Sequence, residues 1–323
     1  MTIAARVARL LAPKRLVFEE QALDPARLAP GEVLAETICS AISVGTEMAA
    51  YLGEPPLRPG PVYPRLVGYC NVAEVLAVGA AVQGLAAGQR VLTLQSHRSA
   101  FICAQDQVVL ALPREADCQL AATTYLFQIG YDALLKGGFD GSQQVAVIGL
   151  GTLGIAAVAL AASLGARVSA YSDQPRSLEL AREVGAAQAF AKSIPAEAAN
   201  ADIVISTSNK WADWRLALNL ARSKGALCVL GFPGRGQAPA DFNPLDSQFF
   251  YDRQLRIIAC GKAPQDDVKR NCAFLLERIL SGRLPARRLI DEVRPWQELG
   301  AIYEALASRK SGQLTRILQW RQA

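Results

Sequence analysis

The pattern of hydrophobic and polar positions changes its period near residue 120. Before that point, apolar and polar residues alternate in short runs, which are typical of half-buried strands. The clearest runs are Val7–Leu10, Leu16–Glu19, Glu32–Ile38 and Asn71–Val78. Proline and glycine interrupt them, most densely over Gly53–Pro64. The first 120 or so residues therefore predict a β-rich unit.

From about Gln143 to Gly261, short apolar runs alternate with longer helix-like stretches. This order predicts a parallel, doubly wound sheet with helices between its strands. The expected strands are 145–148, 167–171, 203–207, 226–231 and 255–259, and the expected helices include 155–164, 175–184 and 214–223. Further helices are expected over 121–135 and 265–281, and a closing strand over 313–319.

The first apolar run of this region leads directly into a glycine motif. Val145–Ile148 is followed by G-x-G-x-x-G and then by the helix-like run Ile155–Leu164. This order is typical of a dinucleotide site, because Gly149 makes the tight turn, Gly151 lets the backbone approach a pyrophosphate and Gly154 lets helix and strand pack closely. Free N–H groups at the helix start favour phosphate there. The predicted cradle is Gly149, Gly151, Thr152, Leu153 and Gly154.

Composition and charge narrow the class of protein. The chain has 323 residues, of which 51% are hydrophobic and 20% charged, enough for two globular domains. The net charge of +5 is spread along the chain, so we expect no nucleic-acid partner. No apolar run reaches the length of a membrane span. Seven widely spaced cysteines without a C-x-x-C pair favour free thiols and a cytoplasmic protein. A hairpin around Ala12–Lys14 explains the arginine-bearing N-terminus better than a transit peptide does.

The chain resembles the medium-chain dehydrogenase/reductase superfamily in motifs along nearly its whole length. Besides the glycine motif, the matching segments are Pro30–Leu34, Val44–Glu47, Gly68 with Glu74 and Val78-Gly79, Gly88–Val91, and Leu178–Ala181 with Gly185-Ala186. Ser43–Glu47 together with Gly68-Tyr69 looks most like the bacteriochlorophyllide hydroxyethyl dehydrogenase-like branch.

The resemblance implies an α/β fold with two domains. A GroES-like, β-rich catalytic domain would comprise residues 1–121 and 263–323, and a doubly wound Rossmann domain would comprise residues 122–262. The active site is expected in the cleft between them. Most members are dimers or tetramers, so we expect a homodimer.

Many members hold a catalytic zinc ion, but this chain lacks the ligands. Where relatives have a cysteine, a histidine and a later cysteine or aspartate, it has Val44, Tyr69 and about Tyr125. Valine cannot bind zinc, and tyrosine is a poor ligand beside thiolate or imidazole. The cysteine-rich structural zinc loop is also missing, and His97 is the only histidine. We therefore predict a zinc-independent member.

Without zinc, the substrate must be activated by hydrogen bonds and a proton donor. The resemblance places Thr46 at the proton-relaying hydroxyl and Tyr69 at the emptied ligand position, although a turn residue and an aromatic wall explain them as well. His97 is the third candidate, because histidine ordinarily titrates near neutral pH. The resemblance also implies that Glu47 pairs with Arg316, which can in addition reach the cofactor phosphates.

The implied cofactor is a nicotinamide dinucleotide. NAD-dependent relatives have an acidic residue at the end of the second Rossmann strand, where this chain has Ser172. Arg176 could pair with a 2′-phosphate, so NADP is favoured. The adjacent Asp173 argues for NAD, which stays open. Further contacts with the ribose and nicotinamide are expected from Ser206, Thr207, Gly231, Phe232, Cys260 and Gly261.

Together these features predict an NAD(P)-dependent dehydrogenase or reductase acting on a small-molecule carbonyl or alcohol. The cofactor performs the hydride transfer, and the protein supplies position and a proton. One alternative is an NADPH-dependent alkene reductase of the enoyl or quinone type. Another is a non-catalytic NADP-binding sensor or structural protein, because acid–base side chains are few.

Overall fold

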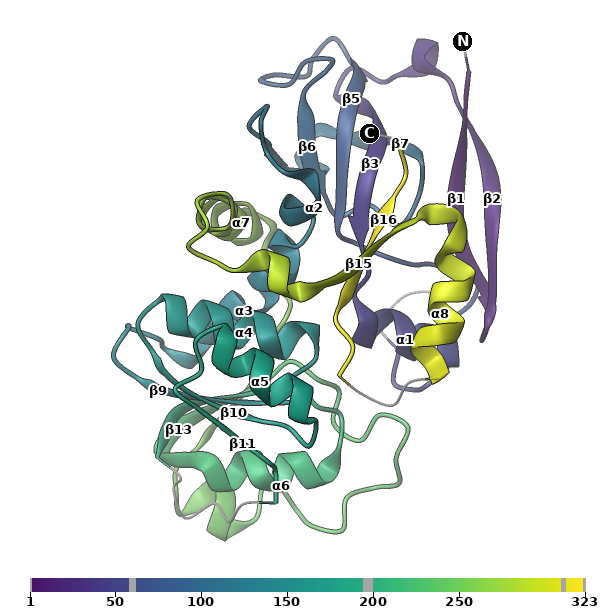
Figure 1. Ribbon diagram of the computed structural model, residues 1–323. Coiled ribbons are helices and arrows are strands. Elements are labelled where there is room, and N and C mark those ends of the chain that lie inside the picture. Colours follow the sequence, from purple (N-terminus) through teal and green to yellow (C-terminus); the bar gives the residue numbers. More distant parts are fainter. Residues whose placement is uncertain (1, 58–61, 194–199, 309–311, 322–323) are drawn as a thin grey trace.

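The chain folds into two units that meet along a cleft. The structure, a computed structural model, describes residues 2–57, 62–193, 200–308 and 312–321. In Figure 1 the upper unit contains both the N-terminal strands and the C-terminal segment, and the lower unit contains the middle of the chain.

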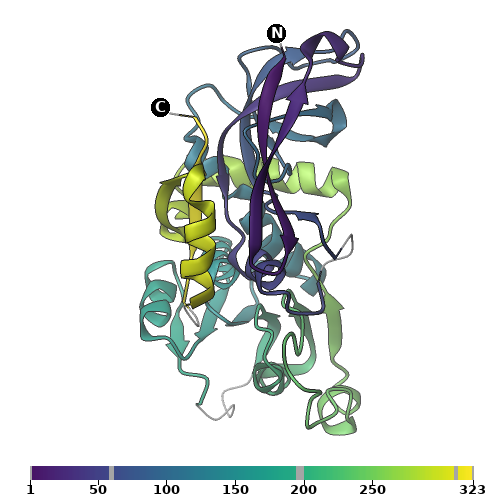
Figure 2. The same cartoon turned by 90° about the vertical axis from the view of Figure 1, so that its right-hand side faces the viewer.

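The upper unit consists of two mixed or antiparallel sheets. Strands β1 (Ile3–Ala12) and β2 (Arg15–Leu23) form the predicted hairpin, a long twisted ribbon in Figure 2, and β4 (Arg65–Leu66) pairs with β1. The larger sheet has the order β15-β16-β3-β5-β6-β8, with β7 paired to β3. Its strands are β3 (Glu32–Ala41), β5 (Asn71–Val78), β6 (Arg90–Thr93), β7 (Ala100–Ala104), β8 (Val108–Ala111), β15 (Ile290–Pro295) and β16 (Thr315–Gln319). Because β16 lies beside β3, the two ends of the chain build one unit.

The lower unit is the predicted parallel, doubly wound sheet. Its order is β11-β10-β9-β12-β13-β14, and every pairing is parallel. The strands are β9 (Gln144–Ile148), β10 (Arg167–Tyr171), β11 (Gln188–Phe190), β12 (Ala201–Ser206), β13 (Ala221–Val229) and β14 (Arg256–Ala259). The strand order reverses between β9 and β12, and ligands bind such sheets at the carboxyl ends beside this point.

Helices cover both faces of this sheet. One face packs against α3 (Thr124–Gly137), α4 (Thr152–Ser163) and α5 (Pro175–Glu183), and the other against α6 (Trp211–Leu220). Helix α7 (Gln265–Leu280) packs against α3, next to the short α2 (Cys118–Ala121). Brief 3-10 or π turns lie at Pro25–Arg27, Gln105–Gln107, Ser247–Tyr251, Ala286–Leu289 and Trp296–Glu298.

Two helices at the cleft were not expected from the sequence. Helix α1 (Val44–Leu52) begins inside the Val44–Glu47 motif, and α8 (Leu299–Ser308) precedes the last strand. They pack on each other in one core cluster, where the rings of Tyr51 and Tyr303 meet edge to face at 5.3 Å. Residues far apart in the sequence thus stabilise the segment that carries the motif.

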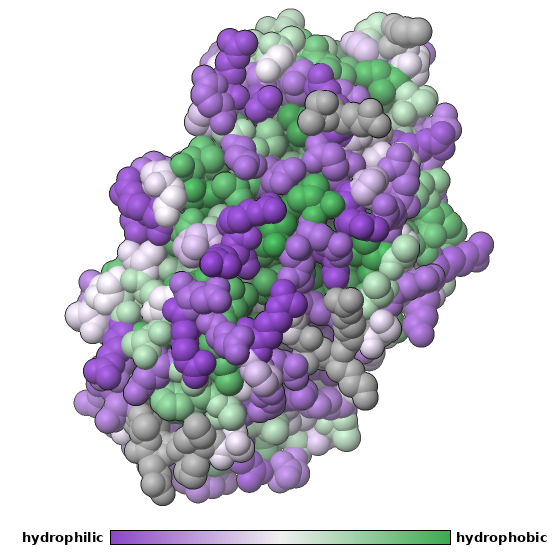
Figure 3. All heavy atoms as spheres, viewed as in Figure 1, coloured by the Kyte–Doolittle hydropathy of each residue, from purple (hydrophilic) through white to green (hydrophobic). Residues whose placement is uncertain are grey.

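The face shown in Figure 3 mixes polar and apolar residues, and the cysteine thiols are free. Hydrophilic and hydrophobic residues are interspersed over the face shown in Figure 3, including the band where the two units meet. All seven cysteines are free. Among the described residues, no helix is both long enough and apolar enough to span a bilayer.

Candidate cofactor and active site

A cavity of about 560 Å³ lies between the two units. The upper unit contributes the start of α1 and the end of α8, and the lower unit contributes the loops that follow β9, β10 and β12. These loops leave the carboxyl ends of the strands at the switch point of the sheet, where doubly wound folds bind nucleotides. Six predicted cofactor residues line the cavity, namely Gly149, Gly151, Thr152, Leu153, Ser172 and Thr207.

The glycine motif forms the tight turn that its spacing predicts. Gly149 has φ 86°, and a Cβ there would lie 2.7 Å from the Thr207 hydroxyl oxygen. The Thr207 hydroxyl donates to the carbonyl oxygen of Gly149 at 2.8 Å and so holds the turn. A Cβ on Gly154 would lie 1.8 Å from that same carbonyl oxygen. The close approach of strand and helix therefore requires glycine at both positions.

Two buried hydroxyls point to an anionic ligand at this turn. Within the described part of the chain, neither Thr152 Oγ1 nor Ser206 Oγ has a hydrogen-bond partner. Thr152 is the first residue of α4 and lines the cavity, and the first turn of α4 contains no acidic side chain. A buried hydroxyl without a partner is costly, and a helix N-terminus attracts phosphate. The turn, the helix and the Thr152 hydroxyl together fit the pyrophosphate of a dinucleotide.

The residues predicted to contact the nicotinamide, Gly231, Phe232, Cys260 and Gly261, do not line the cavity. The backbone N–H of Phe232 donates to Asn209 Oδ1 at 2.8 Å, and the N–H of Gly261 donates to Asp132 Oδ2 at 2.9 Å. A Cβ on Gly231 would lie 2.4 Å from a backbone oxygen. A thiol hydrogen bond to Cys260 and burial raise the pKa of Cys228. These positions are partly buried, and their contact with a cofactor stays a prediction.

The structure does not place Arg176 where it could pair with a 2′-phosphate on the cofactor ribose. The Arg176 side chain is 83% exposed and pairs with Asp291 at 3.6 Å, in a groove separate from the cavity. Ser172 does line the cavity, and its Oγ accepts from the N–H of Gln174 at 3.1 Å. The basic side chain beside Ser172 is Lys192, just beyond β11, which the sequence pattern gave no reason to select.

The expected ion pair between Glu47 and Arg316 is wrong. Arg316 is buried in β16, and its Nε donates to Glu292 at 2.5 Å. The Glu47 carboxylate instead accepts the backbone N–H of Ser43 at 2.6 Å and the hydroxyl of Tyr303. Burial and the Glu47 charge raise the pKa of Tyr303, so that phenol stays a donor. Arg316 also does not line the cavity.

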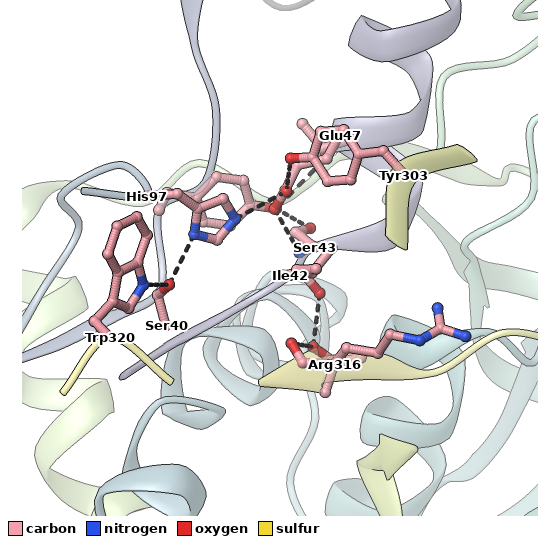
Figure 4. A network of polar contacts seen from close by, with 11 residues as sticks. Ser40, Ile42, Ser43, Glu47, His97, Tyr303, Arg316 and Trp320 are labelled. Atoms are coloured by element: carbon pink, nitrogen blue, oxygen red, sulfur yellow. Dashed lines mark hydrogen bonds and ion pairs between the residues drawn. The ribbon is translucent and has the colours of Figure 1, made fainter. Parts of the chain in front are cut away.

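His97 belongs to the same buried network, and this corrects its predicted role as proton donor. Its side chain is 0% exposed, with Nε2 at 3.0 Å from Glu47 Oε2 and Nδ1 at 2.8 Å from Ser40 Oγ (Figure 4). A Cβ on Gly68 would lie 2.7 Å from the imidazole ring. Packing and hydrogen bonds therefore enclose the ring on all these sides, away from the cavity.

The hydrogen bonds also place a hydrogen on one ring nitrogen of His97. The indole N–H of Trp320 donates to Ser40 Oγ at 2.8 Å. An ionised carboxylate can only accept, so the contact with Glu47 places a ring hydrogen on His97 Nε2. The network thus holds one buried carboxylate between three donors, and it fixes the first turn of α1.

Tyr69 is the candidate proton donor that a hydrogen bond connects to the cavity, through Ser43, although neither Tyr69 nor Thr46 lines the cavity itself. Its hydroxyl forms a short hydrogen bond with Ser43 Oγ and lies 3.4 Å from Thr46 Oγ1. Its ring meets the Tyr125 ring edge to face at 5.6 Å, so the side chains at two of the predicted metal-ligand positions are neighbours. Ser43 lines the cavity and was missed by the sequence analysis. Its signal was its place at the start of the Ser43–Glu47 motif, where the sequence gave it no chemical role.

The side chains at these positions do not fit zinc. Val44 has no donor atom, and thiolate or imidazole ligands are absent from the Tyr69–Tyr125 pair. Throughout the described ranges, no three His, Cys, Asp or Glu side chains are grouped as a metal site.

Part of the chain matches known proteins in sequence. Residues 152–277 match the family of zinc-binding dehydrogenases. NADP-dependent alcohol dehydrogenase C 1 of Mycolicibacterium smegmatis is 32% identical over 140 residues, which are 42% of this chain and 40% of that relative. The match therefore spans well under half of the relative.

Solved structures resemble the chain over nearly its whole length. L-idonate 5-dehydrogenase from Escherichia coli has a TM-score of 0.83 at 16% identity, covering 99% of both chains. A protein assigned as a zinc-binding dehydrogenase from Sinorhizobium meliloti, bound to NADP, has a TM-score of 0.79 at 18% identity, covering 98% of this chain and 99% of that one. Residues 152–277 thus match the family of zinc-binding dehydrogenases in sequence, and the described chain has the fold of these solved structures. The predicted fold is confirmed.

Proposed function

We propose that this protein is a zinc-independent, NAD(P)-dependent oxidoreductase that interconverts a carbonyl and an alcohol. The observation that carries this proposal is the interdomain cavity, which is lined both by the glycine turn and by Ser43, whose hydroxyl is hydrogen-bonded to Tyr69. The fold and the sequence match to NADP-dependent alcohol dehydrogenase support it. At a finer level we propose the bacteriochlorophyllide hydroxyethyl dehydrogenase-like branch and the domain limits 1–121, 122–262 and 263–323.

The nicotinamide ring supplies the hydride acceptor or donor when the cofactor is bound. The chain's own residues do the rest. Thr152 and the N-terminus of α4 hold the pyrophosphate, and the glycine turn admits it. The Tyr69 phenol donates a hydrogen bond and then a proton to the carbonyl oxygen, or accepts it in reverse. Ser43 orients that phenol, because its Oγ binds the phenol oxygen while its N–H is anchored by Glu47.

A substrate panel tests the proposed reaction. Purified protein is mixed with NADPH and, separately, with ketones, aldehydes and enones, and the loss of absorbance at about 340 nm is followed. Turnover with ketones or aldehydes supports the proposal. Turnover with enones alone would favour the alkene reductase instead. Cofactor binding without any turnover would favour the non-catalytic sensor or structural protein.

Metal content gives a second expected outcome. Purified protein should contain far less than one zinc per chain, and its activity should survive prolonged dialysis against a chelator, because Val44 and Tyr69 occupy the ligand positions. Elemental analysis checks this directly, with a zinc-containing alcohol dehydrogenase dialysed in parallel as the control. Close to one zinc per chain, lost together with activity, would contradict the proposal.

NADP as the preferred cofactor, a small-molecule substrate, a homodimer and a cytoplasmic location remain part of the proposal. The NADP-bound structural neighbour supports the first of these. Size-exclusion chromatography with light scattering tests the dimer.

A further inference from the structure

Lys192 lies between two carboxylates, those of Asp173 and Asp213, that differ in solvent exposure. Its Nζ lies 2.6 Å from Asp213 Oδ2 and 3.9 Å from Asp173 Oδ2, and its side chain is 16% exposed. Asp213 is 6% exposed at its side chain and also accepts a short hydrogen bond from Ser208. Asp173 is 56% exposed at its side chain. Asp213 is therefore a fixed partner of the ammonium group, whereas Asp173 is a replaceable one.

The two ion pairs also differ in strength. A long pair with one exposed partner contributes roughly 0–1 kcal/mol, because water screens it. The short pair of Lys192 with the buried Asp213 is screened much less. A ligand that displaces the Asp173 carboxylate from Lys192 thus gives up little, while Asp213 keeps the lysine in place.

Both residues line the cavity where the adenosine ribose of a dinucleotide lies in doubly wound folds. Asp173 follows Ser172 at the end of β10, and Lys192 follows the neighbouring strand β11. A carboxylate at this edge accepts from the ribose 2′- and 3′-hydroxyls, and a cation pairs with a 2′-phosphate. The two opposing chemical requirements are met by side chains that touch each other.

We propose that Asp173 and Lys192 form a selector that lets the cavity accept both NAD(H) and NADP(H). With NAD(H), the Asp173 carboxylate accepts from the ribose hydroxyls and Lys192 stays with Asp213. With NADP(H), the 2′-phosphate takes the place of Asp173 beside Lys192, and Asp173 turns toward solvent. Arg176 has no part in this step. The inference rests on the proposed dinucleotide site and is independent of the substrate.

Binding of nicotinamide-free fragments tests the selector without any turnover. Calorimetry would measure ADP-ribose and 2′-phospho-ADP-ribose against wild type, Asp173→Asn and Lys192→Gln. Asp173→Asn keeps the side-chain shape, removes the charge and leaves the Lys192–Asp213 pair intact. It should tighten 2′-phospho-ADP-ribose by about 5-fold or more and weaken ADP-ribose by a similar factor. Lys192→Gln should weaken 2′-phospho-ADP-ribose by roughly 10- to 100-fold, the usual range for a lost charged hydrogen bond, and change ADP-ribose by less than about 3-fold.

Two matched variants serve as controls. Arg176→Ala removes a positive charge outside the cavity and should not change the ratio of the two affinities. Lys192→Gln leaves the buried Asp213 without its cationic partner. Lys192→Arg, which keeps the positive charge, is therefore measured as well and should retain binding of the phosphorylated fragment.

The outcomes separate the selector from the proposed function. An unchanged affinity ratio in Asp173→Asn, or a selective loss in Arg176→Ala, would overturn the selector while leaving the dinucleotide site in place. If wild-type protein bound neither fragment, the dinucleotide site itself would be wrong.

Discussion

Replacing Tyr69 by phenylalanine should lower kcat by about 100-fold or more, equivalent to about 3 kcal/mol in activation free energy. The substitution removes the hydroxyl that hydrogen-bonds to the cavity-lining Ser43. The ring contact with Tyr125 is retained, so the shape of the site is preserved. Steady-state rates over a pH series, with NADPH affinity measured separately, check the result.

Three further variants separate proton donation from packing. Tyr125→Phe is the matched control, because it deletes the other hydroxyl of the same aromatic pair, and turnover should change by only a few-fold. Thr46→Val should have a smaller effect than Tyr69→Phe, since the Thr46 hydroxyl lies at 3.4 Å. Ser43→Ala should lower kcat by about 10-fold and move the pH profile, because Tyr69 loses its orienting partner. Near-wild-type turnover in Tyr69→Phe would mean that the proton comes from water or from the substrate.

Replacing Glu47 by glutamine should lower the free energy of unfolding by about 3–5 kcal/mol, the usual loss when one member of a buried charged network is removed. The carboxylate accepts from Ser43, His97 and Tyr303, and an amide would turn an NH₂ group toward some of these donors. The expected fall in Tm is roughly 10 °C. Thermal unfolding followed by circular dichroism measures it.

His97→Ala should behave in the same way, with a large loss of stability and little change in NADPH affinity. Both of its ring nitrogens are used inside the protein, so any effect on turnover should follow the loss of folded protein. Glu298→Gln is the control, because its pair with Arg294 is partly exposed at both ends. An exposed pair of this kind contributes about 0–1 kcal/mol. If the Glu47→Gln protein had the same Tm as the wild type, the buried network would not stabilise the fold.

Local sequence was sufficient for most strands and for the glycine turn. The period of two in the first third and the strand–glycine–helix order at Val145–Leu164 depend only on neighbouring residues. Steric fit also explains the success at Gly149 and Gly154, where a Cβ would collide with atoms of Thr207 and of the turn itself. Such requirements appear directly as glycine in the sequence.

Helix α1 could not be predicted in this way. Its sequence begins Val-Gly-Thr, residues of modest helix propensity, and a helix this short is marginal in isolation. It is stabilised by packing against α8 and by the carboxylate of Glu47, which reaches Tyr303 some 250 residues later. The position of the Ser43 and Thr46 hydroxyls therefore depends on contacts that no local window contains.

By itself, then, the sequence determined most of the strands and the glycine turn between β9 and α4. The tertiary structure alone decided the partners. It buried His97 against Glu47, paired Arg316 with Glu292, turned Arg176 out of the cavity and placed Lys192 inside it. The reason is physical: steric and propensity requirements act between neighbours in the chain, whereas charged and hydrogen-bonding side chains take whichever partner the fold brings within about 3 Å.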